Sequence, residues 1–287
     1  MGLCELFGYT KQAYYKACHG QTHRELSEGI MMKILSDYRS DMEHLGGRKL
    51  HLLVNRRLPE GMSIGRDAFF KFLRDNGLLQ RMSHVPRTTN SYHHYHKYSN
   101  LIRDFKSTGA NQLWVSDITY IRAGENKFYY LSLITDCYSH LIIGWCLSKN
   151  LNTEGCIQAL NMALKEHPEN TGLIHHSDRG IQYCSKEYVR ILKAHHIRIS
   201  MTENGDPREN AVAERVNGIL KKEWINDMHF TSIADAKRQI RRAIYLYNNI
   251  RPHFSIDLMT PKEAENSNGT IRRRWRNYYK KDFFEHA

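Results

Sequence analysis

The middle of the chain, residues 111–201, carries the pattern that most restricts the fold. Three runs rich in β-branched and aromatic residues, separated by turn signals, predict consecutive strands over 111–121, 127–137 and 139–148. Helical and strand-like segments then alternate, with helices over 152–167 and 185–196 and strands over 172–176 and 197–201. A long amphipathic helix over 211–225 follows. The order βββαβαβα predicts an α/β domain built on a mixed sheet.

Positive charge is concentrated at the two ends of the chain. The formal net charge of +12 divides into +7 for residues 1–110, −1 for 111–230 and +6 for 231–287. This distribution is typical of basic arms that bind a polyanion around a core with another task, although charge alone does not identify nucleic acid. No apolar run approaches the roughly 18 residues of a membrane span, and the N-terminus has no signal-peptide pattern. The six cysteines include no CxxC pair, which favours reduced thiols in a cytoplasmic protein.

The region before the sheet is predicted to be helical. Helices over 48–57 and 65–76, joined by the turn "PEGMS" and ended by Gly77, fit a helix-turn-helix. We expect its second helix to bury Ile64, Phe69, Phe72 and Leu73. The same helix would expose three basic residues to DNA phosphates or base edges: Arg66, Lys71 and Arg74. A small helical bundle with a solvated basic face is the alternative.

These patterns predict four parts. Residues 1–82 form a helical DNA-binding region, 83–110 a polar linker, 111–268 the sheet domain with its closing helices, and 269–287 a basic tail. The linker contains His93, His94 and His96 but no second cluster at zinc spacing, so we expect no zinc site there.

Three acidic residues occupy places where chemistry is expected. Asp117 interrupts the apolar run of the first strand, and burying a lone carboxylate is costly unless a partner or a cation accompanies it. Asp178 follows the fourth strand, where open sheets hold ligands, although a turn aspartate that caps the next helix is the alternative. At about 100° per residue, Glu214 shares one face of the last core helix with Asn217, Gly218 and Lys221, opposite Val212, Val216 and Ile219.

Convergence of these three acids would define a metal site. Three neighbouring carboxylates repel one another unless cations lie between them, and hard oxygen ligands suit Mg²⁺ or Mn²⁺. Two such ions can activate a nucleophile and stabilise the leaving oxygen during in-line displacement at phosphorus. The acids therefore predict phosphoryl-transfer chemistry with two metal ions per site.

The motifs around the acids resemble those of a known family. "WVSDITYI", "HHSDRGIQY" and "ENAVAERVNGILKKE" resemble the catalytic motifs of the retroviral-integrase superfamily, with 35 residues between Asp178 and Glu214, the D-35-E spacing of that superfamily. "YLYNNIRPHFSIDLMTPKEA" resembles the closing motif of OrfB-type DDE transposases of the insertion-sequence-three family. The resemblance covers residues 35–265 and implies a ribonuclease-H-like integrase catalytic core, in which the first and fourth strands are neighbours and bring Asp117 and Asp178 together.

The resemblance also implies a function. It points to a DNA transposase, a polynucleotidyl transferase in which Asp117, Asp178 and Glu214 hold Mg²⁺ or Mn²⁺. Water would cut a phosphodiester at the element end, and the released 3′-OH would attack another DNA strand in recombination and integration. The implied partners are element-end and target DNA, further copies of the chain on DNA, and an upstream-frame protein as a fusion or partner. The expected location is the bacterial cytoplasm, at the nucleoid when bound to DNA, with no membrane partner.

Four further residues are predicted to contact DNA. Lys221, two helical turns beyond Glu214, resembles the family lysine at the transposon end, with a solvated lysine as the alternative. Asn217, Arg179 and Arg251 complete the set. Structural roles are the alternative for Arg179 and Arg251, and also for the neighbouring His176 and His253.

Two other acids are rivals for the catalytic roles. Asp136 matches an aspartate common in the family, but its place at a hairpin favours a turn role. Glu209 stands near a helix start, where an acid interacts favourably with the helix dipole. The loop "GDPREN" departs from the "GNPYDN" more usual in relatives, which leaves the contacts of that loop open.

Two other functions share parts of this pattern. A stand-alone ribonuclease-H-like nuclease would use the same acids but release its products without joining them. A DNA-binding regulator that no longer catalyses would keep the basic ends and could lose the acids. The intact trio and the N-terminal helices favour the transposase over both.

Overall fold

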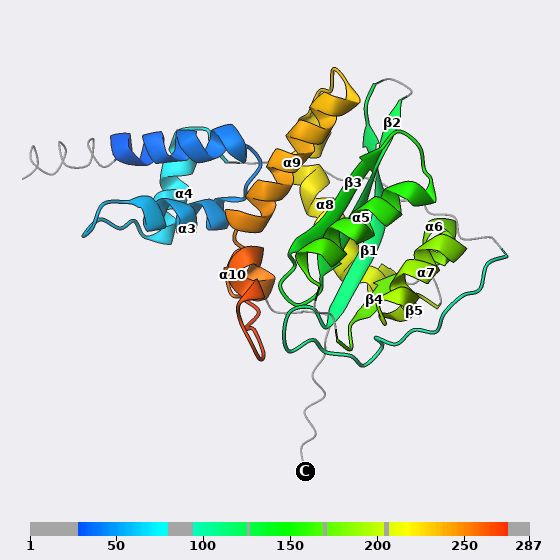
Figure 1. The fold of residues 1–287 in the computed structure, drawn as a ribbon. Coiled ribbons are helices and arrows are strands. Elements are labelled where there is room, and N and C mark those ends of the chain that lie inside the picture. The colour runs from blue at the N-terminus through cyan, green and yellow to red at the C-terminus, as the bar shows by residue number, and fades with distance from the viewer. Residues whose placement is uncertain (1–27, 80–93, 125–126, 169–170, 204–206, 275–287) are drawn as a thin grey trace, which may run out of the picture. The chain divides into compact units, whose positions relative to one another are not determined.

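A computed structural model describes residues 28–79, 94–124, 127–168, 171–203 and 207–274 (Figure 1). The chain divides into two compact units, residues 1–82 and residues 83–287. Parts of the predicted linker (83–93) and of the basic tail (275–287) lie outside the described residues. Among the described helices, none combines the length and the apolar character needed to cross a bilayer.

The described part of the first unit, residues 28–79, is helical, as the sequence predicts, and residues 1–27 and 80–82 of the predicted helical region lie outside the described residues. Residues 28–41 form a helix that the sequence analysis did not delimit, followed by α3 (Gly47–Arg57) and α4 (Arg66–Asp75). Phe69, Phe72 and Leu73 are buried, whereas Ile64 is partly exposed. The three basic residues predicted to face outward are exposed: Arg66, Lys71 and Arg74. The amphipathic arrangement is therefore confirmed, and DNA binding by this face stays a prediction.

Two side chains of α3 fix the start of α4. The Asn55 side chain accepts a hydrogen bond from the Ile64 backbone N–H (2.9 Å) and donates one to the Ile64 carbonyl (3.2 Å). His51 Nε2 lies 2.7 Å from the same carbonyl. At the other end, Gly77 adopts a left-handed conformation (φ 68°) that ends α4, as its position predicts. These contacts hold the two helices in one arrangement.

The second unit is built on a five-stranded mixed sheet of order β3-β2-β1-β4-β5 (Figure 1). The antiparallel part consists of β1 (Leu113–Arg122), β2 (Phe128–Asp136) and β3 (Ile142–Ser148). The short strands β4 (Ile174–Ser177) and β5 (Arg198–Met201) continue the sheet in parallel to β1. All five predicted strands and the predicted order are confirmed, and β1 and β4 are neighbours.

Helices cover both faces of the sheet. On one face, residues of α5 (Thr153–Glu166), α6 (Ile181–Cys184) and α7 (Lys186–Ala194) pack with Trp114 and Ile134 in the larger core. On the other face, Ala213 of α8 (Ala211–Glu223) packs against Leu113, Val115 and Ile174. The approach of α5 is close, because a Cβ at Gly144 of β3 would lie 2.2 Å from the Ala159 carbonyl oxygen. Alternation along β1 thus sends successive side chains into two different cores.

The closing segments pack onto this unit. They comprise α9 (Ile233–Asn249), α10 (Pro261–Glu265) and the 3-10 turns η1 (Pro207–Asn210), η2 (Ile225–Asp227) and η3 (Phe254–Ile256). The Asn248 side chain bonds to both the N–H and the carbonyl of Ile142 (3.0 and 2.9 Å), which ties α9 to the start of β3. Thr260 and Glu263 form a capping box at the start of α10.

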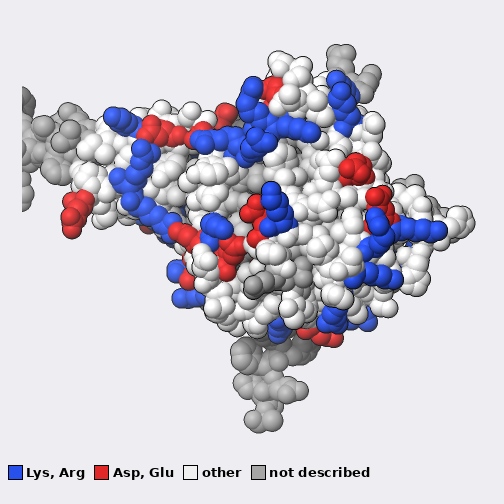
Figure 2. All heavy atoms as spheres, in the orientation of Figure 1, with Lys and Arg blue, Asp and Glu red and all other residues white. Residues whose placement is uncertain are grey.

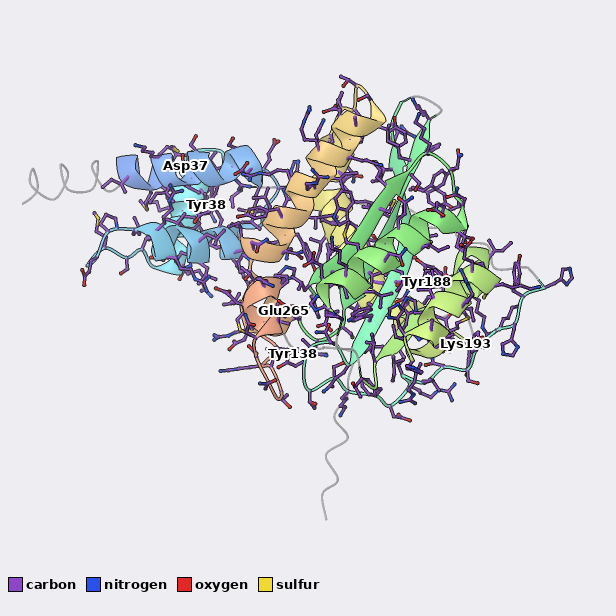
Figure 3. All side chains as sticks on the ribbon, viewed as in Figure 1. Asp37, Tyr38, Tyr138, Tyr188, Lys193 and Glu265 are labelled. Carbon is purple, nitrogen blue, oxygen red and sulfur yellow. The ribbon has the colours of Figure 1, made fainter. Side chains whose placement is uncertain are left out.

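The described part of the predicted linker, residues 94–110, contacts β5 and the chain's closing segment. The Leu101 N–H donates to Ser200 Oγ (2.9 Å), and Met201 N–H donates to the Ser99 carbonyl (3.4 Å). Gly109 forms a β-bridge with Asn268, and Tyr138 donates to the Gly269 carbonyl (3.0 Å; Figure 3). The boundaries drawn from the sequence stay predictions.

Candidate active site

The pairing of β1 with β4 brings two of the predicted acids together. The parallel register ends with Ser116 opposite Ser177, and the next residue on each strand is an aspartate, Asp117 or Asp178. The two residues are 61 apart in sequence, so the sheet alone makes them neighbours. This position at the carboxyl end of a short parallel strand is where the sequence pattern placed the site.

Asp117 is hydrogen-bonded through both carboxylate oxygens. Its Oδ2 accepts a hydrogen bond from Asn217 Nδ2 (2.7 Å), and its Oδ1 accepts one from the Ile118 N–H (2.9 Å). Burial and the charge of Asp178 nevertheless raise the pKa of Asp117 to about 7, and Glu214 adds a smaller increase. The carboxylates therefore share one electrostatic environment that disfavours simultaneous ionisation.

Asp178 is held in a turn at the start of α6. Its Oδ1 accepts a hydrogen bond from the Gly180 N–H (2.9 Å), and Gly180 itself is the N-cap residue of α6. A Cβ at Gly180 would lie 2.9 Å from Asp178 Oδ1, closer than side chains tolerate. The bond to Gly180 supports the turn part of the alternative for Asp178. A glycine at position 180 leaves space for the carboxylate.

Helix α8 supplies the third acid and two neighbours of Asp117. Glu214 lies in the first turn and is exposed, while Asn217 is buried against Asp117. Lys221 is partly buried, and its pKa is lowered by burial while the charge of Asp117 opposes the decrease. One face of α8 thus directs Asn217 and Lys221 toward Asp117, as the helical period predicts.

The apolar face of α8 differs in detail from the prediction. Val216 and Ile219 are buried as expected, but Val212 is only partly buried and Asn217 belongs to the buried face. The remaining buried positions of the helix are Ala213 and Leu220. The helix is rotated so that Asn217 meets the strand, because its amide finds a hydrogen-bond acceptor in Asp117.

The donor atoms suit a hard cation, but the site is not a complete cage. Among the described residues, no group of three His, Cys, Asp or Glu side chains is arranged to hold a metal ion. The chemistry of Asp117 and Asp178 fits a divalent cation, which would relieve their mutual repulsion. Beside them, Asn217 Oδ1 is buried without a hydrogen-bond partner in the described part of the chain. The three-acid metal site stays a prediction.

Several residues near the site have structural contacts. Arg179 Nη1 donates to the Glu203 carbonyl (2.9 Å). Glu209 accepts from the Asn100 side chain (3.2 Å) and from the Glu203 N–H (2.8 Å), which joins the linker to the loop before α8. His176 is buried, with Nδ1 2.8 Å from Ser200 Oγ. Glu209 and His176 therefore brace the fold around the site.

Asp136 has the turn role that its hairpin position favours. It is buried, and its carboxylate accepts from the Asn111 N–H (2.8 Å) and from both the N–H and the hydroxyl of Ser139 (2.8 and 2.6 Å). Burial raises the pKa of Asp136, although these hydrogen bonds oppose the increase.

Arg251 is enclosed in the closing segment. Its guanidinium is 2% exposed and makes a bidentate pair with Glu223, with Nε–Oε2 and Nη2–Oε1 distances of 2.7 and 2.5 Å. It also contacts His253 Nδ1 (3.0 Å) and lies 5.9 Å from the centre of the Tyr247 ring. A guanidinium with its donors occupied inside the protein is not available to phosphate, so the DNA contact predicted for Arg251 is replaced by the structural alternative.

A polar cluster behind the strands was not predicted. His175 Nε2 lies 2.7 Å from Ser116 Oγ and 2.9 Å from the Tyr188 hydroxyl, which α7 directs toward the sheet (Figure 3). Burial lowers the pKa of His175 to about 3, so the imidazole is neutral. Alternation along β1 and β4 places Ser116 and His175 on the face away from Asp117, and this alternation was the signal available in the sequence.

Comparison with known proteins identifies the family. Two Integrase core domain models match residues 107–207 and 195–261. The "Insertion element IS600 uncharacterized 31 kDa protein" of Shigella sonnei is 31% identical over 264 residues, which cover 90% of this chain and 96% of the relative. The transposase for IS904 of Lactococcus lactis is 37% identical over 186 residues, covering 62% of this chain and 73% of the relative. The chain belongs to the insertion-sequence transposases. Transposase InsF of the Escherichia coli element IS3A, 37% identical over 58% of both chains, places it in the insertion-sequence-three family.

This transposase has the ribonuclease-H-like fold of the integrase superfamily, and the family consists of DDE polynucleotidyl transferases. Two solved structures are similar in fold. One is the HTLV-2 integrase catalytic core domain in complex with magnesium, 19% identical with a TM-score of 0.44, covering 56% of this chain and 99% of that one. The other is the simian T-cell lymphotropic virus intasome in complex with a PP2A regulatory subunit, 19% identical with a TM-score of 0.48, covering 83% and 77%.

Proposed function

We propose that this transposase cuts phosphodiesters at the ends of its own element and joins the resulting 3′-OH to another DNA strand. Asp117, Asp178 and Glu214 are the proposed catalytic carboxylates. The observation that carries the proposal is the position of Asp117 and Asp178 at the end of the β1–β4 ladder, where burial and proximity raise the pKa of Asp117 to about 7. Two carboxylates in this arrangement repel each other, so the arrangement is favourable only when a cation or a substrate proton balances their charge.

Mg²⁺ or Mn²⁺ is the cofactor that the donor set suits, with two ions per site. Asp117 and Asp178 would hold the ions together, and Glu214 would complete the set from α8. When bound, such ions lower the pKa of a nucleophile and neutralise the developing charge on the leaving oxygen.

Other residues of the chain would orient the acids and bind the DNA. The Asn217 amide fixes the rotamer of Asp117, and the Gly180 N–H fixes that of Asp178. We propose that Lys221, on the same side of α8 as Asn217, binds a phosphate of the element end. Arg179 stays a candidate for a neighbouring phosphate, and Asn217 acts mainly on Asp117.

The proposed reaction has two displacements at phosphorus. In the first, a water oxygen attacks the phosphodiester, the P–O3′ bond breaks, and the 3′ oxygen leaves as a hydroxyl while the phosphate stays on the 5′ end. In the second, that 3′-OH attacks a target phosphodiester and releases the target strand's own 3′ oxygen. One bond to phosphorus forms and one breaks in each step, so no covalent protein intermediate and no external energy source are needed.

The proposed partners follow from this chemistry. They are element-end DNA, target DNA and further copies of the chain that pair two ends, with an upstream-frame protein as a possible fusion or partner. The exposed residues Arg66, Lys71 and Arg74 of α4 are the proposed end-recognition contacts of the first unit. The proposed location is the bacterial cytoplasm, at the nucleoid when DNA is bound.

A strand-transfer assay with labelled element ends and Mg²⁺ tests the proposal. We expect wild-type protein to produce both cut and joined products, and Asp178→Ala to lose both while retaining DNA binding. Asp104→Ala, which removes an exposed acid of the same unit, is the matched control and should retain both steps. Cleavage without joining would favour a nuclease, and binding without cleavage by wild-type protein would favour a regulator.

A further inference from the structure

The exposed face of α9 carries a row of basic side chains, Lys237, Arg238, Arg241 and Arg242, here called the basic stripe. These positions are exposed, and all of α9 is described. Its other exposed positions, Ala234, Tyr245 and Asn249, are uncharged, because the helix's one acid, Asp235, is buried. Figure 2 shows Lys and Arg side chains gathered over the region where Figure 1 draws α9.

The helix holds the stripe rigidly. Ser232 caps its first turn by accepting from the Asp235 N–H (3.1 Å), and Asn248 ties its last turn to Ile142 of β3. Between these ends Ile240 and Tyr247 are fully buried. A basic row on a fixed helix loses little backbone entropy when it binds an extended partner.

The residues of the stripe differ in the contacts that they make within the protein. Lys237 and Arg241 make no ion pair with any residue that the structure describes, and Arg238 is paired with Asp235 (2.7 Å). The Arg242 guanidinium lies 5.7 Å from the ring centre of Tyr245, which is 52% exposed. The ring holds this guanidinium close to the helix surface.

We propose that the basic stripe binds the phosphate backbone of duplex DNA at a place separate from the three acids. The buried face of α9 packs toward α8, β3 and α10, so the stripe faces away from α8 and from Asp117. From position 237 to 242 it extends about 7.5 Å along the helix axis, and duplex DNA carries one charge per about 1.7 Å of its axis. Several phosphates are therefore within reach of one stripe.

The chemistry of the stripe favours DNA backbone over a protein partner. Its charged groups are all of one sign and include three guanidiniums, which suit phosphate oxygens, and its single exposed aromatic residue is already covered by Arg242. We expect this binding to be independent of base sequence, because contacts to phosphates do not distinguish one base pair from another. This inference rests on the proposed function in one respect, since it takes DNA as the substrate.

The test compares two triple variants of the full-length chain. Lys237→Gln, Arg241→Gln and Arg242→Gln together remove three of the four charges of the stripe, leave Arg238 paired with Asp235, and keep good helix formers. Lys186→Gln, Arg190→Gln and Lys193→Gln on α7 remove the same charge from another exposed helical face. Binding of a fluorescent duplex of arbitrary sequence is measured over a series of salt concentrations, and cleavage is measured on a short element-end duplex that stops close to the cut.

We expect the stripe variant to bind the arbitrary duplex more weakly, with a salt slope reduced by about 2.7 if all three side chains contact phosphate. Its cleavage of the short element end should be unchanged, and the α7 variant should match wild type apart from a small effect of net charge. Equal slopes for the two variants would overturn the inference, as would a stripe variant that binds normally but changes oligomeric state. Failure of wild-type protein to bind or cut any DNA would instead overturn the proposed function.

Discussion

Replacing Asp117 by asparagine should make the metal-free protein more stable at high pH. The Asp117 carboxyl has its pKa raised from an ordinary 3.8 to about 7. Between these values the folded chain keeps a proton that the unfolded chain has lost, so stability falls as the pH rises from about 4 to about 7 and stays lowered above that. The amide introduced by Asp117→Asn cannot ionise and escapes this penalty, and the Asn217 amide can rotate to bond with it.

The size of the effect follows from the pKa. A rise from 3.8 to about 7 corresponds to about 4 kcal/mol at about 1.4 kcal/mol per pKa unit. Because Asp117 is partly exposed, solvent screening reduces this value, and we expect about 2 kcal/mol at pH 8. The pH-dependent part of this difference should be below about 1 kcal/mol at pH 4 and should vanish only near pH 2, where Asp117 is protonated in both the folded and the unfolded state.

Urea unfolding in the presence of EDTA, at pH values of about 4, 6 and 8 that bracket the transition, measures this difference. Asp235→Asn is a control for which we expect a change in stability of the opposite sign. Hydrogen bonds from Thr231 and other neighbours lower the pKa of Asp235, so replacing this carboxylate should destabilise the fold above pH 4. An Asp117→Asn protein that is less stable than wild type at pH 8 would refute the reasoning. So would a stabilisation that does not depend on pH.

Two further pairs of substitutions test the packing of the second unit. Gly144→Ala should destabilise the second unit by about 3 kcal/mol, because the new Cβ would lie 2.2 Å from the Ala159 carbonyl oxygen. Gly218→Ala should instead raise the midpoint of thermal unfolding slightly, because no atom lies within 4 Å of its new Cβ. Arg251→Gln should lower the free energy of unfolding by about 3 kcal/mol, because it breaks the bidentate pair with the mostly buried carboxylate of Glu223. Arg103→Gln, which breaks an exposed pair with Glu203, should lower it by less than about 1 kcal/mol, and urea unfolding measures both. Equal costs for either matched pair would contradict the role given to burial.

The sheet and its large helices could be predicted because their patterns are local. Alternation and β-branched residues mark β1 to β3, and the helical period marks α5, α8 and α9 over several turns. The four-residue helix α6 was missed, since a single turn between Gly180 and Ser185 is too short to show a period. The helix over residues 28–41 was not delimited either, although the region was expected to be helical.

The site shows the same division between local and distant information. Motif spacing named Asp117 and Asp178, and the β1–β4 register places them together. A helical wheel put Asn217 on the correct side of α8, but it could not show that the amide is buried against a carboxylate 100 residues away. Arg251 was taken for a DNA contact because its acceptor, Glu223, lies 28 residues earlier and nothing local announces the pair. Charge on a sequence does not reveal which charges the fold has already neutralised.

The pairing of β1 with β4 also determines when a chain under synthesis can become active. Ser116 and Ser177 must meet before the aspartates are neighbours, and α8 is complete only at Glu223. A polypeptide that ends before residue 214 keeps its N-terminal helices but lacks Glu214, the third of the proposed catalytic acids. We therefore expect translation products that end before residue 214 to lack the proposed DNA-cutting activity.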